Sequence, residues 1–153
     1  WRVTCPAEKM LDSESFVRSI EQGRQTPPTN SVPGSRRVLI VEDEALIAME
    51  LIDMLKDAGY EVVGPAGSVG SALELLKEEG CDAAILDVNL GNESAAPVAQ
   101  VLAERGTPFL TVSGYGSAQR PLEFSSAPHL NKPLRSERLV RTLQSCFSAH
   151  QQQ

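Results

Sequence analysis

Residues 83–90 read Ala-Ala-Ile-Leu-Asp-Val-Asn-Leu, an apolar run that is broken by a carboxylate. Burying an unpaired charge is costly, so we expect a buried strand over 83–88 with Asp87 at its exit. A second apolar run at 37–41, Arg-Val-Leu-Ile-Val, is followed directly by three acids at 42–44. Two apolar strands that both end in acids predict an acidic pocket at one edge of a parallel sheet.

From Arg36 onward, apolar strands alternate with amphipathic helices. We predict strands over 37–41, 61–64, 83–88, 108–112 and 128–131. We predict helices over 44–58, 68–79, about 95–105 and about 135–148. Residues 114–127 are rich in Gly, Ser and Pro, so any helix there is expected to be short. Right-handed crossovers place helices on both faces, so the expected fold class is α/β, a five-stranded, doubly wound parallel sheet.

The first 35 residues differ in character from the rest of the chain. Residues 25–35 contain three prolines among mainly polar residues, which is typical of a linker. We therefore predict an N-terminal extension and Pro-rich linker over 1–35 and one domain over 36–150. The opening Trp1, with no initiator methionine, predicts a fragment of a longer chain or a processed or engineered start.

The charge balance excludes some classes of partner. The 153 residues carry a net charge of −6, all of it in 36–153, because residues 1–35 hold four basic and four acidic side chains. Phosphate contacts need Lys and Arg, so no nucleic-acid partner is expected. No run approaches the roughly 20 apolar residues of a membrane span, and no signal peptide is visible, so no membrane partner is expected. Three widely spaced cysteines predict reduced thiols in the cytoplasm.

Polar side chains follow four of the predicted strands: Glu42 with Asp43, Asp87, Ser113 and Lys132. Ligands of such sheets bind at the carboxyl ends of the strands. Clustered carboxylates repel one another unless a cation joins them, and oxygen ligands without His or Cys favour Mg²⁺. A carboxylate can also act as a nucleophile and form an aspartyl phosphate, with a metal and a lysine supplying positive charge. The set is therefore chemically complete for phosphorylating Asp87.

Four blocks of the sequence carry a resemblance to a known family. They are Val38-Leu-Ile-Val-Glu-Asp-Glu44, Ile85-Leu-Asp-Val-Asn-Leu90, Ser113-Gly114 and Lys132-Pro133. With these blocks in this order, residues 36–148 resemble a receiver domain of the two-component response-regulator family. The resemblance implies the flavodoxin-like fold of CheY-like receivers.

The resemblance also implies a role for each matched position. The expected Mg²⁺ site consists of Glu42, Asp43, Asp87 and the backbone carbonyl of Asn89. Asp87 matches the phosphoacceptor of the family. Ser113 matches the switch hydroxyl and Lys132 the invariant lysine, both of which bind the phosphoryl group.

His129 stands three residues before Lys132, where the family usually has a Tyr or Phe whose rotation reports phosphorylation. His129 is therefore a candidate switch position. Residues 112–116, Val-Ser-Gly-Tyr-Gly, also resemble a subgroup that reads Phe-x-Thr-Gly-Tyr-Gly after the fourth strand. Such receivers stand alone or lie at the end of hybrid histidine kinases, and both arrangements stay open.

The function implied is that of a phosphorelay module in the bacterial cytoplasm. It would accept a phosphoryl group from phosphohistidine on a histidine kinase or a histidine phosphotransfer protein, and would signal through altered protein contacts. It would not be an enzyme for a separate substrate, beyond catalysing its own phosphorylation and dephosphorylation. Two alternatives are a degenerate receiver that acts as a constitutive docking domain and an Asp-nucleophile phosphohydrolase. The second needs a further acid where Asn89 stands.

Overall fold

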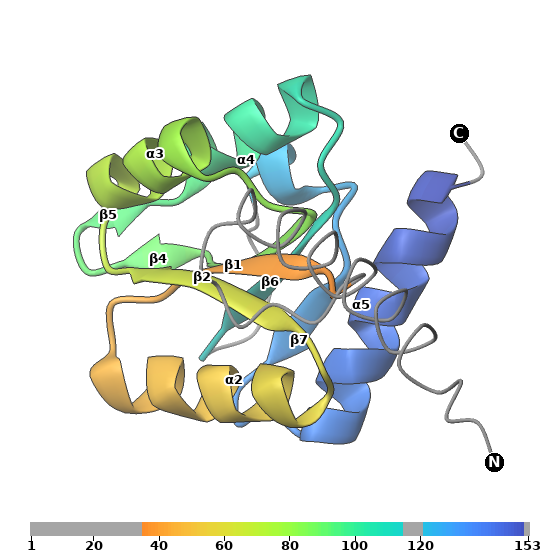
Figure 1. Cartoon of the computed structure of the whole chain (residues 1–153). Helices are drawn as coiled ribbons and strands as arrows, with labels where there is room; N and C mark the ends of the chain where they lie inside the picture. Colours follow the sequence, from red (N-terminus) through yellow and green to blue (C-terminus); the bar gives the residue numbers. More distant parts are fainter. Residues whose placement is uncertain (1–34, 115–120, 152–153) are drawn as a thin grey trace, which may run out of the picture. The chain divides into compact units, whose positions relative to one another are not determined.

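The computed structural model describes residues 35–114 and 121–151. Its central sheet has five parallel strands, β1 (Arg37–Val41), β2 (Glu61–Ala66), β3 (Ala83–Asp87), β6 (Phe109–Ser113) and β7 (His129–Asn131). Their order across the sheet is β2-β1-β3-β6-β7 (Figure 1). The order reverses between β1 and β3, and this switch point is where ligands bind in sheets of this kind.

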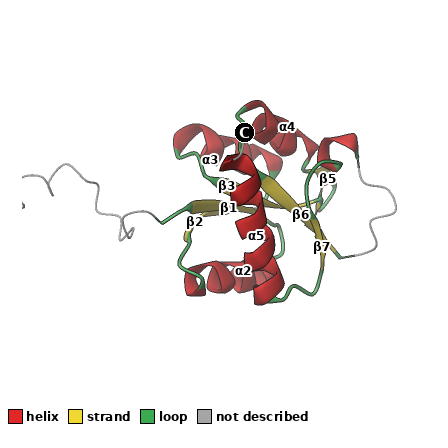
Figure 2. Cartoon of the chain, turned by 90° about the vertical axis from the view of Figure 1, so that its right-hand side faces the viewer, coloured by secondary structure: helices red, strands yellow, loops and turns green. Residues whose placement is uncertain are grey.

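Helices cover both faces of the sheet. They are α2 (Ala45–Asp57), α3 (Val69–Glu78), α4 (Ala96–Glu104) and α5 (Ser136–Gln151). Helices α2 and α5 pack on one face and α3 and α4 on the other, as two views at right angles show (Figures 1 and 2). The predicted fold class, a doubly wound parallel sheet of flavodoxin-like type, is confirmed. None of the helices described here is long and apolar enough to cross a membrane.

Strand β1 shows why the central strands read as unbroken apolar runs. Val38 and Ile40 lie in the core cluster beneath α2 and α5, whereas Leu39 and Val41 lie in the cluster beneath α3 and α4. All four are almost fully buried, because successive side chains of a strand point to opposite faces and both faces are covered. Burial of an apolar side chain contributes roughly 1.5–3 kcal/mol, so this strand fixes the position of the residues that follow it.

Strand β1 has the predicted bounds, and the other predicted elements differ from theirs by one to three residues. Strand β2 runs on to Ala66, and α5 runs to Gln151 rather than 148. The predicted strand over 83–88 ends at Asp87, where a short antiparallel hairpin that the sequence did not predict begins. The hairpin consists of β4 (Asn89–Leu90) and β5 (Glu93–Ser94).

Part of the predicted organisation falls on residues that the structure does not describe. Residues 114–127 were expected to hold at most a short helix, and their described part contains the 3₁₀ helix η1 (Leu122–Phe124). Residues 115–120 lie outside the described part of the chain. So does the predicted extension and linker, apart from Ser35, and the domain bounds 36–150 stay a prediction.

Candidate functional site

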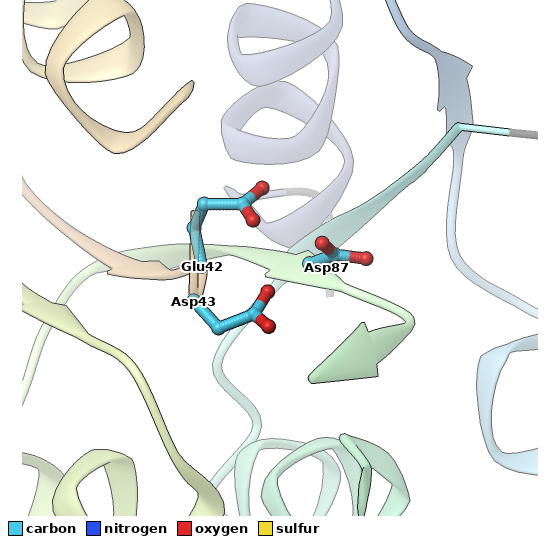
Figure 3. Close-up of side chains that lie close together, drawn as sticks. All are labelled: Glu42, Asp43 and Asp87. Carbon is cyan, nitrogen blue, oxygen red and sulfur yellow. The ribbon is translucent and has the colours of Figure 1, made fainter. Parts of the chain in front are cut away.

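Neighbouring strands bring the predicted acids together at the carboxyl edge of the sheet. Val41 of β1 pairs with Leu86 of β3, so the residues that follow them come side by side. Figure 3 shows Glu42 and Asp43 extending from the end of β1 toward Asp87. One carboxylate oxygen from each of the three lies within 4.8 Å of the others. The acidic pocket predicted from the two apolar runs is therefore present.

Lys132 reaches this pocket from the loop after β7. Its Nζ lies 2.9 Å from Oδ2 of Asp87 and 2.9 Å from Oε2 of Glu42. The Lys132 backbone N–H donates to the carbonyl of Ser113 at 2.9 Å, which ties this loop to the end of β6. Burial opposes the charge of Lys132, but the close contacts and negative charges of Asp87 and Glu42 outweigh burial and raise the pKa of Lys132. One ammonium thus bridges two carboxylates.

Glu42 is the carboxylate of the pocket whose charged form is disfavoured by burial. Its side chain is fully buried, and this burial raises its pKa to about 7, although Lys132 and the backbone N–H of Glu44 act in the opposite direction. Oε1 accepts the Glu44 N–H at 3.1 Å. Oε2 contacts Lys132 as an ion pair, but without the directed geometry of a hydrogen bond, and it has no hydrogen-bond partner among the described residues. A metal ion bound to this oxygen would add a second positive charge beside the buried carboxylate and so favour its ionised form.

The unpredicted hairpin closes one side of the pocket. The backbone N–H of Asn89, the first residue of β4, donates to Oδ1 of Asp87 at 3.0 Å. At the hairpin turn Gly91 has φ +61°, and a Cβ at this position would lie 3.6 Å from Oδ2 of Asp43. The two oxygens of Asp87 therefore each have one N–H donor, from Asn89 and from Lys132. The role expected for the Asn89 carbonyl in metal binding stays a prediction.

Ser113 and His129 form a second group of contacts at the same edge. Ser113 ends β6, next to Val112, which pairs with Asp87. Its Oγ lies 3.0 Å from Nε2 of His129, the candidate switch residue. Nδ1 of His129 lies 2.9 Å from Oγ1 of Thr111, the residue that pairs with His129 across β6 and β7.

Sequence reasoning missed Thr111. A polar residue inside an apolar strand could have indicated it, because a buried hydroxyl needs a partner. Thr111 is fully buried, and Oγ1 also lies 3.3 Å from the Pro128 carbonyl. The imidazole of His129 is therefore held between two hydroxyls.

Residues 38–144 match the family model described as the response regulator receiver domain. The chain belongs to the response regulator receiver-domain family. Transcriptional regulatory protein PdtaR of Mycobacterium tuberculosis H37Rv is 32% identical over 130 residues, which are 82% of this chain and 62% of PdtaR. The chain thus spans about three fifths of that relative. Its receiver fold is that of the two-component response regulators.

Solved structures agree with this assignment. The solution structure of SdrG from Sphingomonas melonis Fr1 is 39% identical, with a TM-score of 0.67, and covers 74% of this chain and 97% of SdrG. The CheY-like receiver from Methanospirillum hungatei JF-1 has a TM-score of 0.69 at 22% identity and covers 78% of this chain and 98% of its own; it supports the fold alone.

The acidic cluster suits a hard divalent ion such as the Mg²⁺ of receiver domains. Its candidate ligands are carboxylate oxygens, with neither His nor Cys among them. The buried Oε2 of Glu42 has the Lys132 ammonium 2.9 Å away as an ion-pair partner but makes no directed hydrogen bond, so a metal ion could also bind this oxygen. Glu42, Asp43, Asp87 and Lys132 thus form one cluster of ionisable side chains, while Ser113 and His129 contact each other beside it.

Proposed function

We propose that Asp87 accepts the phosphoryl group in this receiver domain. In this proposal Glu42, Asp43 and Asp87, with the carbonyl of Asn89, hold Mg²⁺. The contact that carries the proposal is the 2.9 Å approach of the Lys132 ammonium to Oδ2 of Asp87, inside a cluster of carboxylates. The ammonium supplies positive charge next to the oxygen that would attack, which is the charge that a transferring phosphoryl group needs.

The reaction is a transfer between two nucleophiles. An oxygen of Asp87 attacks the phosphorus of a phosphohistidine, the O–P bond forms as the N–P bond breaks, and the released imidazole takes up a proton. Mg²⁺ would supply the positive charge that lets phosphoryl oxygens approach the carboxylates. The Lys132 ammonium adds a second positive charge and moves from Asp87 to a phosphoryl oxygen as the bond forms. The Ser113 hydroxyl donates to another phosphoryl oxygen.

The partners follow from the chemistry of the donor. Asp87 is only 4% exposed, so a protein donor must present its phosphoryl group at the end of a projecting side chain. Phosphohistidine on a histidine kinase or a histidine phosphotransfer protein meets this need, and we place the reaction in the cytoplasm. The chain would act on itself, catalysing its own phosphorylation and hydrolysis, and would signal through changed protein contacts.

Intact-mass analysis after incubation with acetyl phosphate and Mg²⁺ tests the proposal. One phosphoryl group is expected on the parent protein and none on Asp87→Asn. Asp57→Asn is the matched control, because Asp57 is an exposed acid at the end of α2, and it should be phosphorylated like the parent. An undiminished adduct on Asp87→Asn would refute the assignment. Repeated turnover of a phosphate monoester would point instead to a phosphohydrolase.

A further inference from the structure

Two loops flank Asp43, the exposed member of the acidic cluster. A Cβ on Gly67, which follows β2, would lie 3.9 Å from Cα of Asp43. A Cβ on Gly91, at the turn of the β4–β5 hairpin, would lie 3.6 Å from Oδ2 of Asp43. These two loops therefore border the pocket beside Asp43.

One side chain joins the two loops. Oε2 of Glu93, on β5, accepts the backbone N–H of Val69 at 3.3 Å, across 24 positions of the sequence. Val69 is the first residue of α3, so the contact ties the hairpin to the start of this helix (Figure 1). The donor is a backbone amide and the acceptor is a carboxylate, so the direction of this hydrogen bond is fixed.

The start of α3 has a use for this carboxylate. The first N–H groups of a helix have no intrahelical partner. Ser68 caps α3, but its hydroxyl accepts the N–H of Ser71 and not that of Val69. The first turn of α3 contains no acidic residue. Glu93 thus supplies, from another element, the negative charge that the helix dipole favours at this end.

The contact between the hairpin and α3 completes a ring around Asp43. The end of β1 is tied to the end of β2, because the Glu42 N–H donates to the Ala66 carbonyl at 2.9 Å. Strands β1 and β3 pair directly. The hairpin is tied to the end of β3, because the Asn89 N–H donates to Oδ1 of Asp87 at 3.0 Å. The hydrogen bond to α3 closes this series of links.

The hairpin needs such a link because it is small. Each of its strands has two residues, and a two-stranded hairpin is marginally stable by itself. Leu90 is buried in the core cluster beneath α3 and α4 and anchors the inner part of the hairpin. Gly91, Asn92 and Glu93 are exposed. The hydrogen bond with Val69 therefore restrains the outer part.

We propose that Glu93 is a positioning residue for the metal site: its hydrogen bond with Val69 holds the β4–β5 hairpin in place and so fixes the Asn89 carbonyl as a ligand. This inference rests on the Mg²⁺ site of the proposed function. The Asn89 carbonyl belongs to β4, so a hairpin that moves takes this ligand with it. Mg²⁺ demands near-ideal octahedral geometry, so its affinity falls when one ligand is no longer held.

Two variants break the contact from opposite sides. Glu93→Ala removes the acceptor. Val69→Pro removes the donor and keeps the charge of Glu93. Proline is favoured at the first position of a helix, and Ser68, with φ −147° and ψ 163°, already has the extended conformation that suits the residue before a proline. Glu74→Ala is the matched control, because it removes an equal charge from an exposed position of α3.

Calorimetry of the full chain measures the Mg²⁺ affinity. Glu93→Ala and Val69→Pro should each bind Mg²⁺ about fivefold more weakly, the effect of one net hydrogen bond, and Glu74→Ala should bind it like the parent. The double variant should bind as weakly as either single one, because the same contact is lost only once. Parent affinity in Val69→Pro would assign the effect of Glu93 to its charge and overturn the inference. Additive losses in the double variant would also overturn it.

Two further measurements distinguish positioning from a general loss of structure. Without metal, amide hydrogen exchange at Asn89 should be about fivefold faster in both contact variants, whereas exchange in α5 should be unchanged. With acetyl phosphate, the Mg²⁺ concentration for half-maximal phosphorylation should rise about fivefold, and the rate at saturating Mg²⁺ should stay that of the parent. A lower rate at saturation with unchanged half-saturation would contradict a role in holding a metal ligand.

The failure of this inference differs from failure of the proposed function. Mass spectrometry with acetyl phosphate reports on Asp87, and calorimetry reports on the metal site. An adduct on Asp87, together with parent Mg²⁺ affinity in both contact variants, overturns the role of Glu93 alone. Weakened Mg²⁺ binding in both variants, without an adduct in the parent, supports the role of Glu93 and overturns the phosphoacceptor. A parent that binds no Mg²⁺ overturns the metal site and the role of Glu93 together.

Discussion

The two sides of the carboxyl edge of the sheet differ in the side chains that they bring together. The side formed by β1 and β3 holds three clustered carboxylates and one ammonium, with Oε2 of Glu42 lacking a hydrogen bond. The side formed by β6 and β7, called the neutral side because the Thr111 and Ser113 hydroxyls carry no charge, holds the His129 ring in contact with a hydroxyl at each nitrogen. The first side can hold a cation through its carboxylates, and the second is joined by contacts between hydroxyls and an imidazole. The proposed phosphoacceptor Asp87 and the candidate switch residue His129 therefore lie on different strands, β3 and β7.

This difference predicts unequal effects of substitution. Charges that are buried together interact strongly, so removal of one partner leaves another uncompensated. Neutral hydrogen bonds each contribute roughly 0.5–1.5 kcal/mol net. Substitutions on the acidic side should therefore affect the rate of phosphorylation and the response to Mg²⁺ and pH. Those on the neutral side should affect stability and signal with little effect on transfer.

Lys132→Met should have the largest effect. Loss of the ammonium beside Asp87 removes a charge that stabilises the transferring phosphoryl group, and we expect acetyl phosphate to react about 100-fold more slowly or worse. Mg²⁺ affinity, measured by calorimetry, should rise, because a competing cation has gone from the carboxylates. Tighter Mg²⁺ binding also shows that the variant is folded.

Lys56→Met is the matched control for this substitution. Lys56 is exposed on α2 and is separated in the sequence from the residues of the carboxyl edge. It should react at the parent rate. If Lys132→Met also kept the parent rate, the acidic side would not depend on its bridging ammonium, and the contrast between the two sides would be lost.

The sequence predicted the acidic side far better than the neutral one. Glu42 and Asp87 each follow an apolar run, which places them at strand ends. A strand that is covered on both faces is apolar along its whole length, so the first acid shows where it ends. Lys132 was predicted by its place after the last strand. Periodicity could not predict the β4–β5 hairpin, since strands of two residues carry no periodic signal.

Thr111 shows a different limit. It reads as an interior strand residue, and threonine suits strands well. Its contact with His129 depends on the register of β6 against β7, which pairs these two residues across 17 intervening positions. Register is a tertiary property that no local pattern supplied, so the hydroxyl–imidazole chain appears only in the structure.

Glu42→Gln should have the next largest effect, visible in the pH dependence of stability. The pKa of Glu42 is raised from 4.5 to about 7, so the folded state holds this proton more tightly than the unfolded state. Its contribution to stability is complete below pH 4.5 and is lost as the pH rises toward 7. Without metal, the parent should lose on the order of 2–3 kcal/mol from this group over that range, and the variant should not.

Chemical denaturation at several pH values, with and without Mg²⁺, measures this effect. Mg²⁺ should stabilise the parent more at pH 8 than at pH 6, because it competes with the proton for Glu42, and should stabilise Glu42→Gln much less. Glu44→Gln is the control, because Glu44 is an exposed neighbour. If the free energy of unfolding changed with pH in the same way in the parent and in Glu42→Gln, the charged form of Glu42 would not be disfavoured by burial.

The smallest effect should come from the neutral side, in a double-mutant cycle of Thr111→Val and His129→Phe. Each variant breaks the same 2.9 Å contact, so the cost of the second is reduced once the first is present. Urea denaturation should give a coupling of about 1 kcal/mol. Pairing His129→Phe with Thr142→Val, whose hydroxyl donates within α5 to the Arg138 carbonyl, should give additive costs.

The same double variant tests the separation of the two sides. It keeps Asp87, Lys132 and the acid pair, so acetyl phosphate should still phosphorylate it within about threefold of the parent rate. About threefold corresponds to roughly 0.6 kcal/mol, which is at the lower end of the range for one neutral hydrogen bond. A loss comparable to that of Lys132→Met would mean that His129 and Thr111 take part in the transfer itself. Retained transfer with a coupled loss of stability would instead establish that receiving the phosphoryl group and responding to it depend on different strands.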